Sequence, residues 1–109
     1  MKLPAVVVGA QPVIPQTNLD DWTSTVIGLV AQMKGCARPA ARSHVRVGGD
    51  EAVVLAYPNC PAAPSLYHLW TVLVHGGRGY QIVWFNTHGQ EPGDRAVLDK
   101  MLASVSFAD

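Results

Sequence analysis

Apolar residues follow the two-residue period of β-strands over much of this chain, and they change to the period of a helix in two places. The longest β-like stretch is Leu66–Thr87, where two runs rich in Tyr, Trp, Val, Ile and Thr flank the sequence Gly-Gly-Arg-Gly. Such residues favour strands, and glycines supply the positive φ angles of a tight reversal. This stretch predicts an antiparallel hairpin with Gly76, Gly77 and Gly79 in its turn.

The predicted hairpin has apolar residues on both faces of the sheet, so each face needs a cover. Placing His75 opposite Tyr80 defines how its two strands pair. The cross-strand pairs are then Leu73–Ile82 and Thr71–Trp84 on one face, and Val72–Val83 and Trp70–Phe85 on the other.

Two segments have the periodicity of amphipathic helices. Thr17 or Asn18 can cap the first helix, and Gly35 ends it. Its apolar stripe is Leu19, Trp22, Val26, Leu29, Val30 and Met33. The second helix is expected to begin with Asp94 as its cap, and Phe107 then closes the core. Its buried stripe is Val97, Leu98, Met101, Leu102 and Val105.

Three further strands are expected: residues 4–13 centred on Val6–Val8, then Ser43–Val47, and Glu51–Tyr57 after a turn at Gly48-Gly49-Asp50. The order β-α-β-β-β-β-α predicts an α+β protein with an antiparallel meander and two helices. One helix on each face gives an α/β/α sandwich. The alternative places both helices on one face and leaves an apolar sheet face open for binding.

Composition narrows the class of protein. The chain has 109 residues, of which 49% are hydrophobic and 15% charged, as expected for a single globular domain over residues 1–109. Eight basic and eight acidic residues balance, so there is no basic stripe for nucleic acid or an anionic membrane. No apolar run is long enough for a transmembrane segment. Lys2 and the valines after it resemble a very short signal peptide, but a first strand explains them better.

The two cysteines, Cys36 and Cys60, are expected at the same edge of the molecule. The strand after Cys36 runs away from the first helix, and its partner returns to Cys60. This placement predicts a Cys36–Cys60 disulfide, which points to an exported protein. The alternative is a pair of partly buried thiols.

No arrangement of residues that typifies catalysis or metal binding is found in the sequence. The four histidines lack close ligand spacing, and His68 and His75 fall on opposite faces of one strand. They are interpreted as surface or turn residues. Gly76–Gly79 lies between two strands, whereas a phosphate loop leads into a helix. We therefore expect no enzyme activity, no cofactor and no metal.

The aromatic residues of the hairpin leave two interpretations open. They form part of the core, or they line a surface for a ligand or partner. Trp70 and Phe85, with Val72 and Val83 on the same face, are the candidate binding surface if that face is incompletely covered.

Four segments resemble the PsbP-like/Mog superfamily, close to actinobacterial LpqN-type lipoproteins. They read LDDWTSTVIGLVAQM, VGGDEAVVLAYP, GGRGYQIVWFNT and LDKMLASVSF, and they follow in the family's order over residues 19–107. The resemblance implies a helix-flanked antiparallel sheet and a non-enzymatic, exported protein. Relatives have a hairpin before the first strand, so the resemblance also implies an absent sheet edge or a trimmed form.

These observations predict a non-catalytic binding module that is secreted or in the cell envelope, with a protein or a hydrophobic envelope ligand as its partner. A cytosolic interaction adaptor is the alternative, and a small hydrolase or metalloprotein is a third. The protein itself is expected to be a monomer or a weak homodimer, because an unpaired edge strand can pair with itself.

Overall fold

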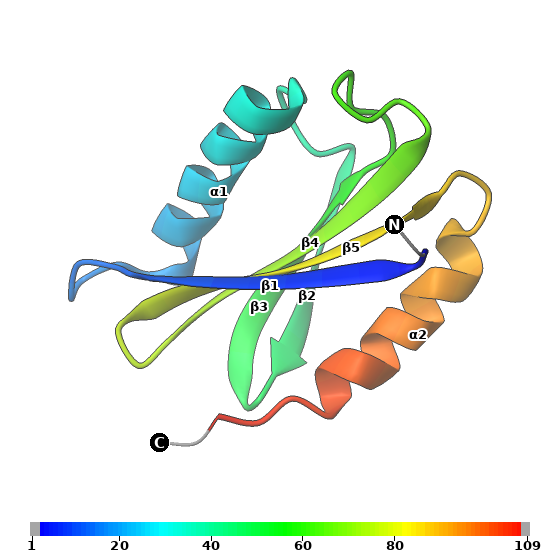
Figure 1. Cartoon of the computed structure of the whole chain (residues 1–109). Helices are drawn as coiled ribbons and strands as arrows, with labels where there is room; N and C mark the ends of the chain where they lie inside the picture. Colours follow the sequence, from blue (N-terminus) through cyan, green and yellow to red (C-terminus); the bar gives the residue numbers. More distant parts are fainter. Residues whose placement is uncertain (1–2, 108–109) are drawn as a thin grey trace.

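The computed structural model describes residues 3–107, which form one five-stranded antiparallel sheet with a helix on each face (Figure 1). In chain order the elements are β1 (Ala5–Pro12), α1 (Leu19–Lys34), β2 (Ala41–Val47), β3 (Asp50–Tyr57), β4 (Leu66–His75), β5 (Arg78–Thr87) and α2 (Glu91–Ala103). The predicted α+β class and the order β-α-β-β-β-β-α are confirmed. Lys2, which figured in the signal-peptide interpretation, lies outside the described residues.

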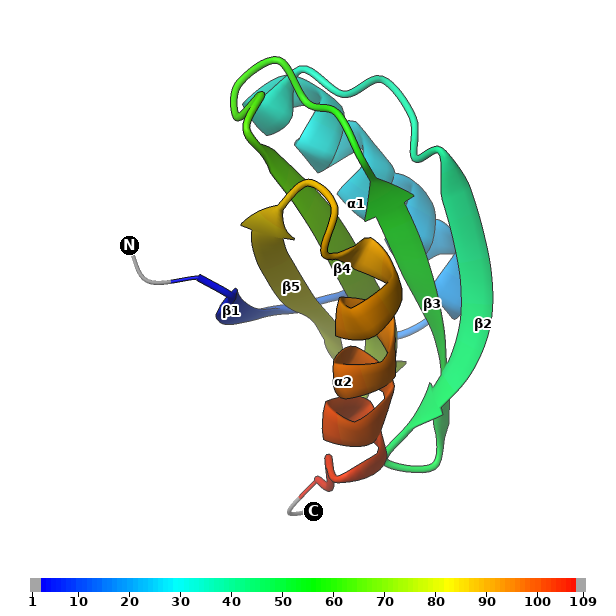
Figure 2. The same cartoon turned by 90° about the vertical axis from the view of Figure 1, so that its right-hand side faces the viewer.

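The strands lie in the order β1-β5-β4-β3-β2, so the first two strands of the chain occupy opposite edges of the sheet. Helix α1 connects them and covers one face, where it contacts β4 and β3. Helix α2 lies on the other face (Figures 1 and 2). The described residues thus adopt the sandwich with one helix per face, and the alternative with both helices together is wrong.

The central hairpin turns at two residues, Gly76 and Gly77, whose φ angles are 57° and 75°. His75 therefore pairs with Arg78, and the strands are shifted by two residues from the predicted pairing with Tyr80. A shift of two keeps every side chain on its predicted face, because the side-chain period of a strand is two. The predicted faces of the side chains are therefore correct, although the individual cross-strand pairs were wrong.

Gly79 has a different role from the turn glycine that was predicted. It lies inside β5, and a Cβ atom built on it would come within 2.5 Å of the Trp22 ring. The indole of Trp22 lies against this bare stretch of backbone and donates its Nε1 hydrogen to the Tyr80 carbonyl at 3.0 Å. Gly79 is therefore required by helix-to-sheet packing.

Helix α1 begins and ends as predicted. The Asn18 side chain accepts a hydrogen bond from the Asp21 amide at 2.8 Å, and Gly35 closes the helix with a φ angle of 72°. The helix buries its i, i+4 row, which is Trp22, Val26 and Val30. Met33 was predicted in the buried stripe but is 54% exposed. Met33 lies to one side of this row. Because the row itself packs on the sheet, the residues beside it remain open to solvent.

Helix α2 buries Leu98 and Leu102 against the opposite face of the sheet. Val97, predicted to be buried with them, is 53% exposed because it is displaced around the helix from Leu98. After the helix, Phe107 packs against the same core and stacks on His75 with ring centroids 4.0 Å apart. His75 Nδ1 lies 2.7 Å from an Asp50 carboxylate oxygen.

A Cys36–Cys60 disulfide links the loop after α1 to the loop after β3, as predicted, with a Cα–Cα distance of 5.1 Å. It joins residues 24 positions apart. Closing a loop of this size stabilises the fold by about 3 kcal/mol in the chain-entropy model. None of the helices in the described part of the chain is long and apolar enough to cross a membrane.

Candidate binding site

The N-terminal end of α2 carries a carboxylate that faces the sheet. Asp94 was predicted as the helix cap, but the helix begins at Glu91, and its cap residue Gln90 makes no side-chain capping bond. Asp94 lies within the first turn, one helical turn before the buried Leu98. Its side chain is therefore on the inward face of the helix.

Three donors from the sheet converge on the same oxygen of Asp94. Oδ2 accepts hydrogen bonds from the Tyr67 hydroxyl, from Trp84 Nε1 at 3.0 Å and from Asn86 Nδ2 at 2.7 Å. Tyr67 pairs with Asn86, and Trp84 is two residues before Asn86 on β5. All three donors therefore project from the same face of the sheet. We call Asp94, Tyr67, Trp84 and Asn86 the Asp94 cluster.

The hydrogen bonds set the charge state of the Asp94 cluster. Burial acts to raise the pKa of Asp94, but the bonds from Tyr67, Trp84 and Asn86 outweigh it and hold that pKa below its ordinary value. Burial and the neighbouring Asp94 carboxylate together raise the pKa of Tyr67. Asp94 is therefore an anion at neutral pH, and Tyr67 is a neutral donor to it.

A small hollow lies beside the Asp94 cluster, between the first turns of α2 and the neighbouring ends of β3 and β4. Its volume is about 200 Å³, and we call it the Ala56 pocket. Its lining is mostly apolar: Ala40, Ala56, Tyr57, Pro58, Tyr67, His68, Leu69, Glu91 and Arg95.

The pocket exists because the sheet carries short side chains where α2 begins. Ala56 pairs with Leu69 on one side and with Ala41 on the other, so two neighbouring strands present alanine there. Farther along α2, the side chains of Leu98 and Leu102 fill the corresponding space. The charged residues of the lining are Glu91 and Arg95.

Both charged residues of the pocket interact with neighbouring residues. Glu91 Oε1 accepts a hydrogen bond from the Gly89 amide at 2.6 Å. Arg95 Nε donates to Asp99 Oδ1 at 2.9 Å, one turn farther along α2. The rim therefore carries one negative and one positive group, and each of them already has a partner. An uncharged group with an apolar body suits this pocket best.

His68 borders the Ala56 pocket and is a buried polar residue of another kind. His68 was interpreted as a surface or turn residue, but only 1% of it is exposed. Neither of its ring nitrogens has a hydrogen-bond partner among the described residues, and its ring meets Phe85 edge-on at 4.8 Å. Burial, and secondarily the nearby Lys34 ammonium, lower the pKa of His68. The residue is thus neutral at physiological pH.

The candidate surface predicted from the hairpin is covered. Trp70, Val72 and Val83 are each at most 3% exposed, and Phe85 is partly buried against the same cluster. Helix α1 lies over this face and excludes solvent from it. The alternative interpretation, in which these aromatic residues form the core, is the right one for Trp70.

Sequence reasoning missed both the Asp94 cluster and the Ala56 pocket. One signal was available: Asn86 is a polar residue that continues the alternation of Tyr80, Ile82 and Trp84 on one face, eight residues before an aspartate. The pocket has no such signal, because a short side chain in a strand does not show whether a distant element fills the space beside it. Within residues 3–107 no group of three or more His, Cys, Asp or Glu residues is placed to hold a metal ion.

No family model matches the chain, and no curated protein matches it. Among solved structures it is similar to PA94 from Pseudomonas aeruginosa, a protein of unknown function described as a candidate regulator. The match has a TM-score of 0.65 and covers 100% of this chain and 87% of PA94, at 8% sequence identity. At this identity the likeness shows that the two proteins share a fold and nothing further.

Proposed function

We propose that this protein is a non-catalytic binding module of a secreted or cell-envelope compartment, and that the Ala56 pocket receives an apolar side chain of a protein partner. The observation that carries the proposal is the pocket itself, an apolar hollow bounded by secondary-structure elements on a disulfide-linked scaffold.

The size of the pocket favours a protein over a lipid or a free small molecule. At about 200 Å³ it is smaller than the roughly 300–1,000 Å³ typical of small-molecule sites. That volume is of the order of one large side chain. Protein interfaces concentrate their affinity in a few such side chains, each inserted into a pocket on the partner.

The rigidity of the pocket walls also supports this use. Tyr67 and Leu69 lie on β4 in the middle of the sheet, and the Asp94 cluster joins α2 to that strand. A preformed pocket costs little conformational entropy when it is filled. The neutral balance of Glu91 and Arg95 suits an uncharged aliphatic or aromatic group.

The binding part of the proposal can be tested with N-acetyl-leucine amide and N-acetyl-phenylalanine amide as probes. Titration of ¹⁵N-labelled protein should shift the amide signals of Ala56, Leu69 and Arg95, with millimolar affinity for so small a ligand. Ala56→Leu should fill the pocket and abolish the shifts. Ala96→Leu, the same change at an exposed position of α2, should leave them intact.

Two results would contradict this assignment. One is a set of shifts scattered away from the pocket. The other is unchanged binding in Ala56→Leu protein whose circular dichroism and melting temperature match the parent.

The compartment rests on the disulfide, because such bonds persist in oxidising environments and are rare in reducing ones. Protein isolated from its native cells and alkylated before reduction should show both Cys36 and Cys60 protected by mass spectrometry. Two freely alkylated thiols would favour the cytosolic adaptor instead.

We also propose, on the succession of the four segments, that the chain is related to the PsbP-like/Mog proteins and the LpqN-type lipoproteins. A helix-flanked antiparallel sheet is compatible with that relationship. A family-wide sequence alignment that fails to place those segments in register would count against it.

A further inference from the structure

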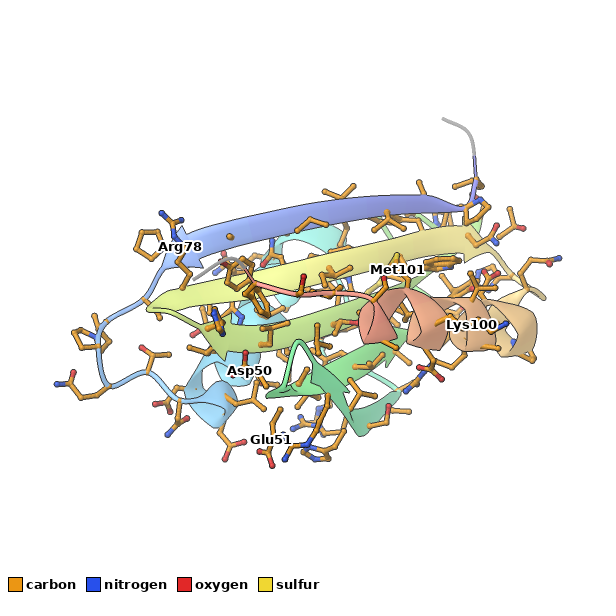
Figure 3. The ribbon with its side chains drawn as sticks, turned by 90° about the horizontal axis from the view of Figure 1, so that it is seen from below. Asp50, Glu51, Arg78, Lys100 and Met101 are labelled. Carbon is orange, nitrogen blue, oxygen red and sulfur yellow. A yellow bond between two sulfur atoms is a disulfide. The ribbon has the colours of Figure 1, made fainter. Side chains whose placement is uncertain are left out.

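Strand β1 forms one edge of the sheet, and its valines are unusually open to solvent. Figure 3 shows β1 as the outermost strand, with Arg78 at the end of the strand beside it. Val6, Val7 and Val8 are 40%, 55% and 65% exposed. No other described segment pairs with the outer side of β1. An apolar, unpaired edge of this kind is a template for another strand.

The pairing of the hairpin determines which main-chain groups of β1 point outward. His75 and Arg78 flank a two-residue turn, so they form a hydrogen-bonded pair. Counting from Arg78, every second residue of β5 therefore makes its main-chain hydrogen bonds to β4. The residues between them, such as Val83, bond to β1, where the partner of Val83 is Val7. The bond from the Val13 amide to the Gly77 carbonyl at 3.1 Å continues this pattern.

It follows that Val6, Val8 and Ala10 direct their N–H and C=O groups away from the sheet. Pro12, at the end of the strand, falls in the same outward series. A proline at this position loses no hydrogen bond to β5. Edge strands tolerate proline at positions that face away from the neighbouring strand. Pro4 precedes the strand in the same series.

The two prolines are symmetric about Val8: Pro4 is four residues before it and Pro12 four residues after it. An antiparallel pairing of β1 with a second β1, centred on Val8, places Val6 opposite Ala10 of the second copy. The prolines then oppose one another and end the ladder at both sides. Such a pairing forms about six main-chain hydrogen bonds.

We propose that β1 pairs with β1 of a second copy of this chain about a two-fold axis at Val8, which makes a ten-stranded sheet. This surface is distinct from the Ala56 pocket, which lies at the ends of β3 and β4. Opposed residues of an antiparallel pair lie on the same face. The dimer therefore places Val8 beside Val8 of the second copy and Val6 beside its Ala10, which removes part of their exposed surface from solvent.

Charge also favours a second copy at this edge and not at the other. Residues Ala5–Pro12 contain no charged side chain, so two copies meet without repulsion. The opposite edge strand, β2, carries Arg42 and Arg46, and self-pairing there would bring like charges together. The interface is short, at the low end of specific interfaces, so the expected dissociation constant is roughly 1–100 µM.

Sedimentation velocity of the 109-residue protein between 1 µM and 1 mM should show a monomer–dimer equilibrium. Val8→Pro removes the amide at the axis without removing a bond to β5, and it should weaken the dimer at least tenfold. His44→Pro makes the same change at an outward position of β2 and should leave the dimer unchanged. Val8→Lys, which opposes two ammonium groups, provides a second variant if Val8→Pro proves to be unfolded.

Amide hydrogen exchange reads out the pairing itself. In dilute monomer, Val7 and Gly9 should be protected and Val6, Val8 and Ala10 should exchange fast. Raising the concentration should protect the latter three. A protein that stays monomeric at 1 mM, or a dimer insensitive to both Val8 variants, would overturn the proposal. So would protection of all five amides in dilute monomer, because another segment would then cover the edge.

Discussion

The two faces of this sheet are covered by helices of similar length but are secured in different ways. On the α1 face, the Trp22 ring lies against the backbone of Gly79, and the Cys36–Cys60 disulfide fastens the loop that follows the helix. On the α2 face, the first turn of the helix is joined to the sheet by hydrogen bonds to Asp94. One face is held by shape and a covalent bond, the other by a polar cluster together with the apolar contacts of Leu98 and Leu102.

This difference explains where a binding site can form. The α1 face is filled by large side chains, and Trp22, Trp70 and Val72 on that face are each at most 3% exposed. On the α2 face, the helix is attached to the sheet at two places. These are the Asp94 cluster at one end and the apolar contacts of Leu98 and Leu102 farther along. The short side chain of Ala56 near the polar anchor leaves a hollow beside it. Hydrogen bonds to Asp94 require donors at fixed positions, but they do not require apolar side chains that fill all the space around the cluster.

Removing the apolar anchor of the α1 face should have the largest effect. Trp22→Ala is expected to lower the free energy of unfolding by roughly 3–5 kcal/mol, because it deletes a fully buried indole. Urea denaturation followed by circular dichroism measures this loss. Met33→Ala, at an exposed position of the same helix, should cost well under 1 kcal/mol by comparison.

A second substitution shows whether shape is the cause. Gly79→Ala should destabilise the parent protein, because its Cβ would lie 2.5 Å from the Trp22 ring. In the Trp22→Ala background the same change should cost almost nothing. Equal costs in the two backgrounds would show that Trp22 and Gly79 are not coupled.

Weakening the polar anchor of the α2 face should have a smaller and pH-dependent effect. Asp94→Asn keeps the shape but replaces charge-assisted hydrogen bonds with neutral ones, at a cost of about 1–2 kcal/mol at pH 7. The pKa of Asp94 is lowered in the folded protein, so its charge stabilises the fold above the pKa of the unfolded chain, near 4. That contribution is lost as the pH falls through the folded value.

The stability difference between parent and Asp94→Asn protein should therefore be constant from about pH 5 to 7 and shrink below about pH 4. Urea denaturation over that range measures it. Asp99→Asn is the matched control, since it changes an exposed carboxylate of the same helix that pairs with Arg95. A difference that is independent of pH would mean that the charge of Asp94 does not hold the helix.

The local features of the fold could be predicted because they depend on neighbours in the chain. The Asn18 cap, the Gly35 helix end and the glycine turns are determined within a few residues. The side-chain faces of the hairpin were also correct, since even a two-residue shift in pairing preserves them. The pairing itself was not, because three glycines allowed more than one turn length.

The long-range features required the tertiary structure. Asp94 could serve as a cap or face the sheet, and only the approach of Tyr67, Trp84 and Asn86 from two other strands decided this. Gly79 could belong to the turn, and only the position of Trp22 showed why it lies in a strand.

The amino-acid sequence by itself therefore determined the order of the elements, the two apolar faces, the disulfide partners and the absence of net charge. Those properties arise from periodicity and composition along the chain. The tertiary structure alone decided that α1 covers Trp70 and that Ala56 lies under the start of α2. It also decided that β1 occupies an edge with Val8 outward. These three features depend on which distant segments of the chain come together. Packing of the helices on the sheet selects those contacts, and local conformational preference does not.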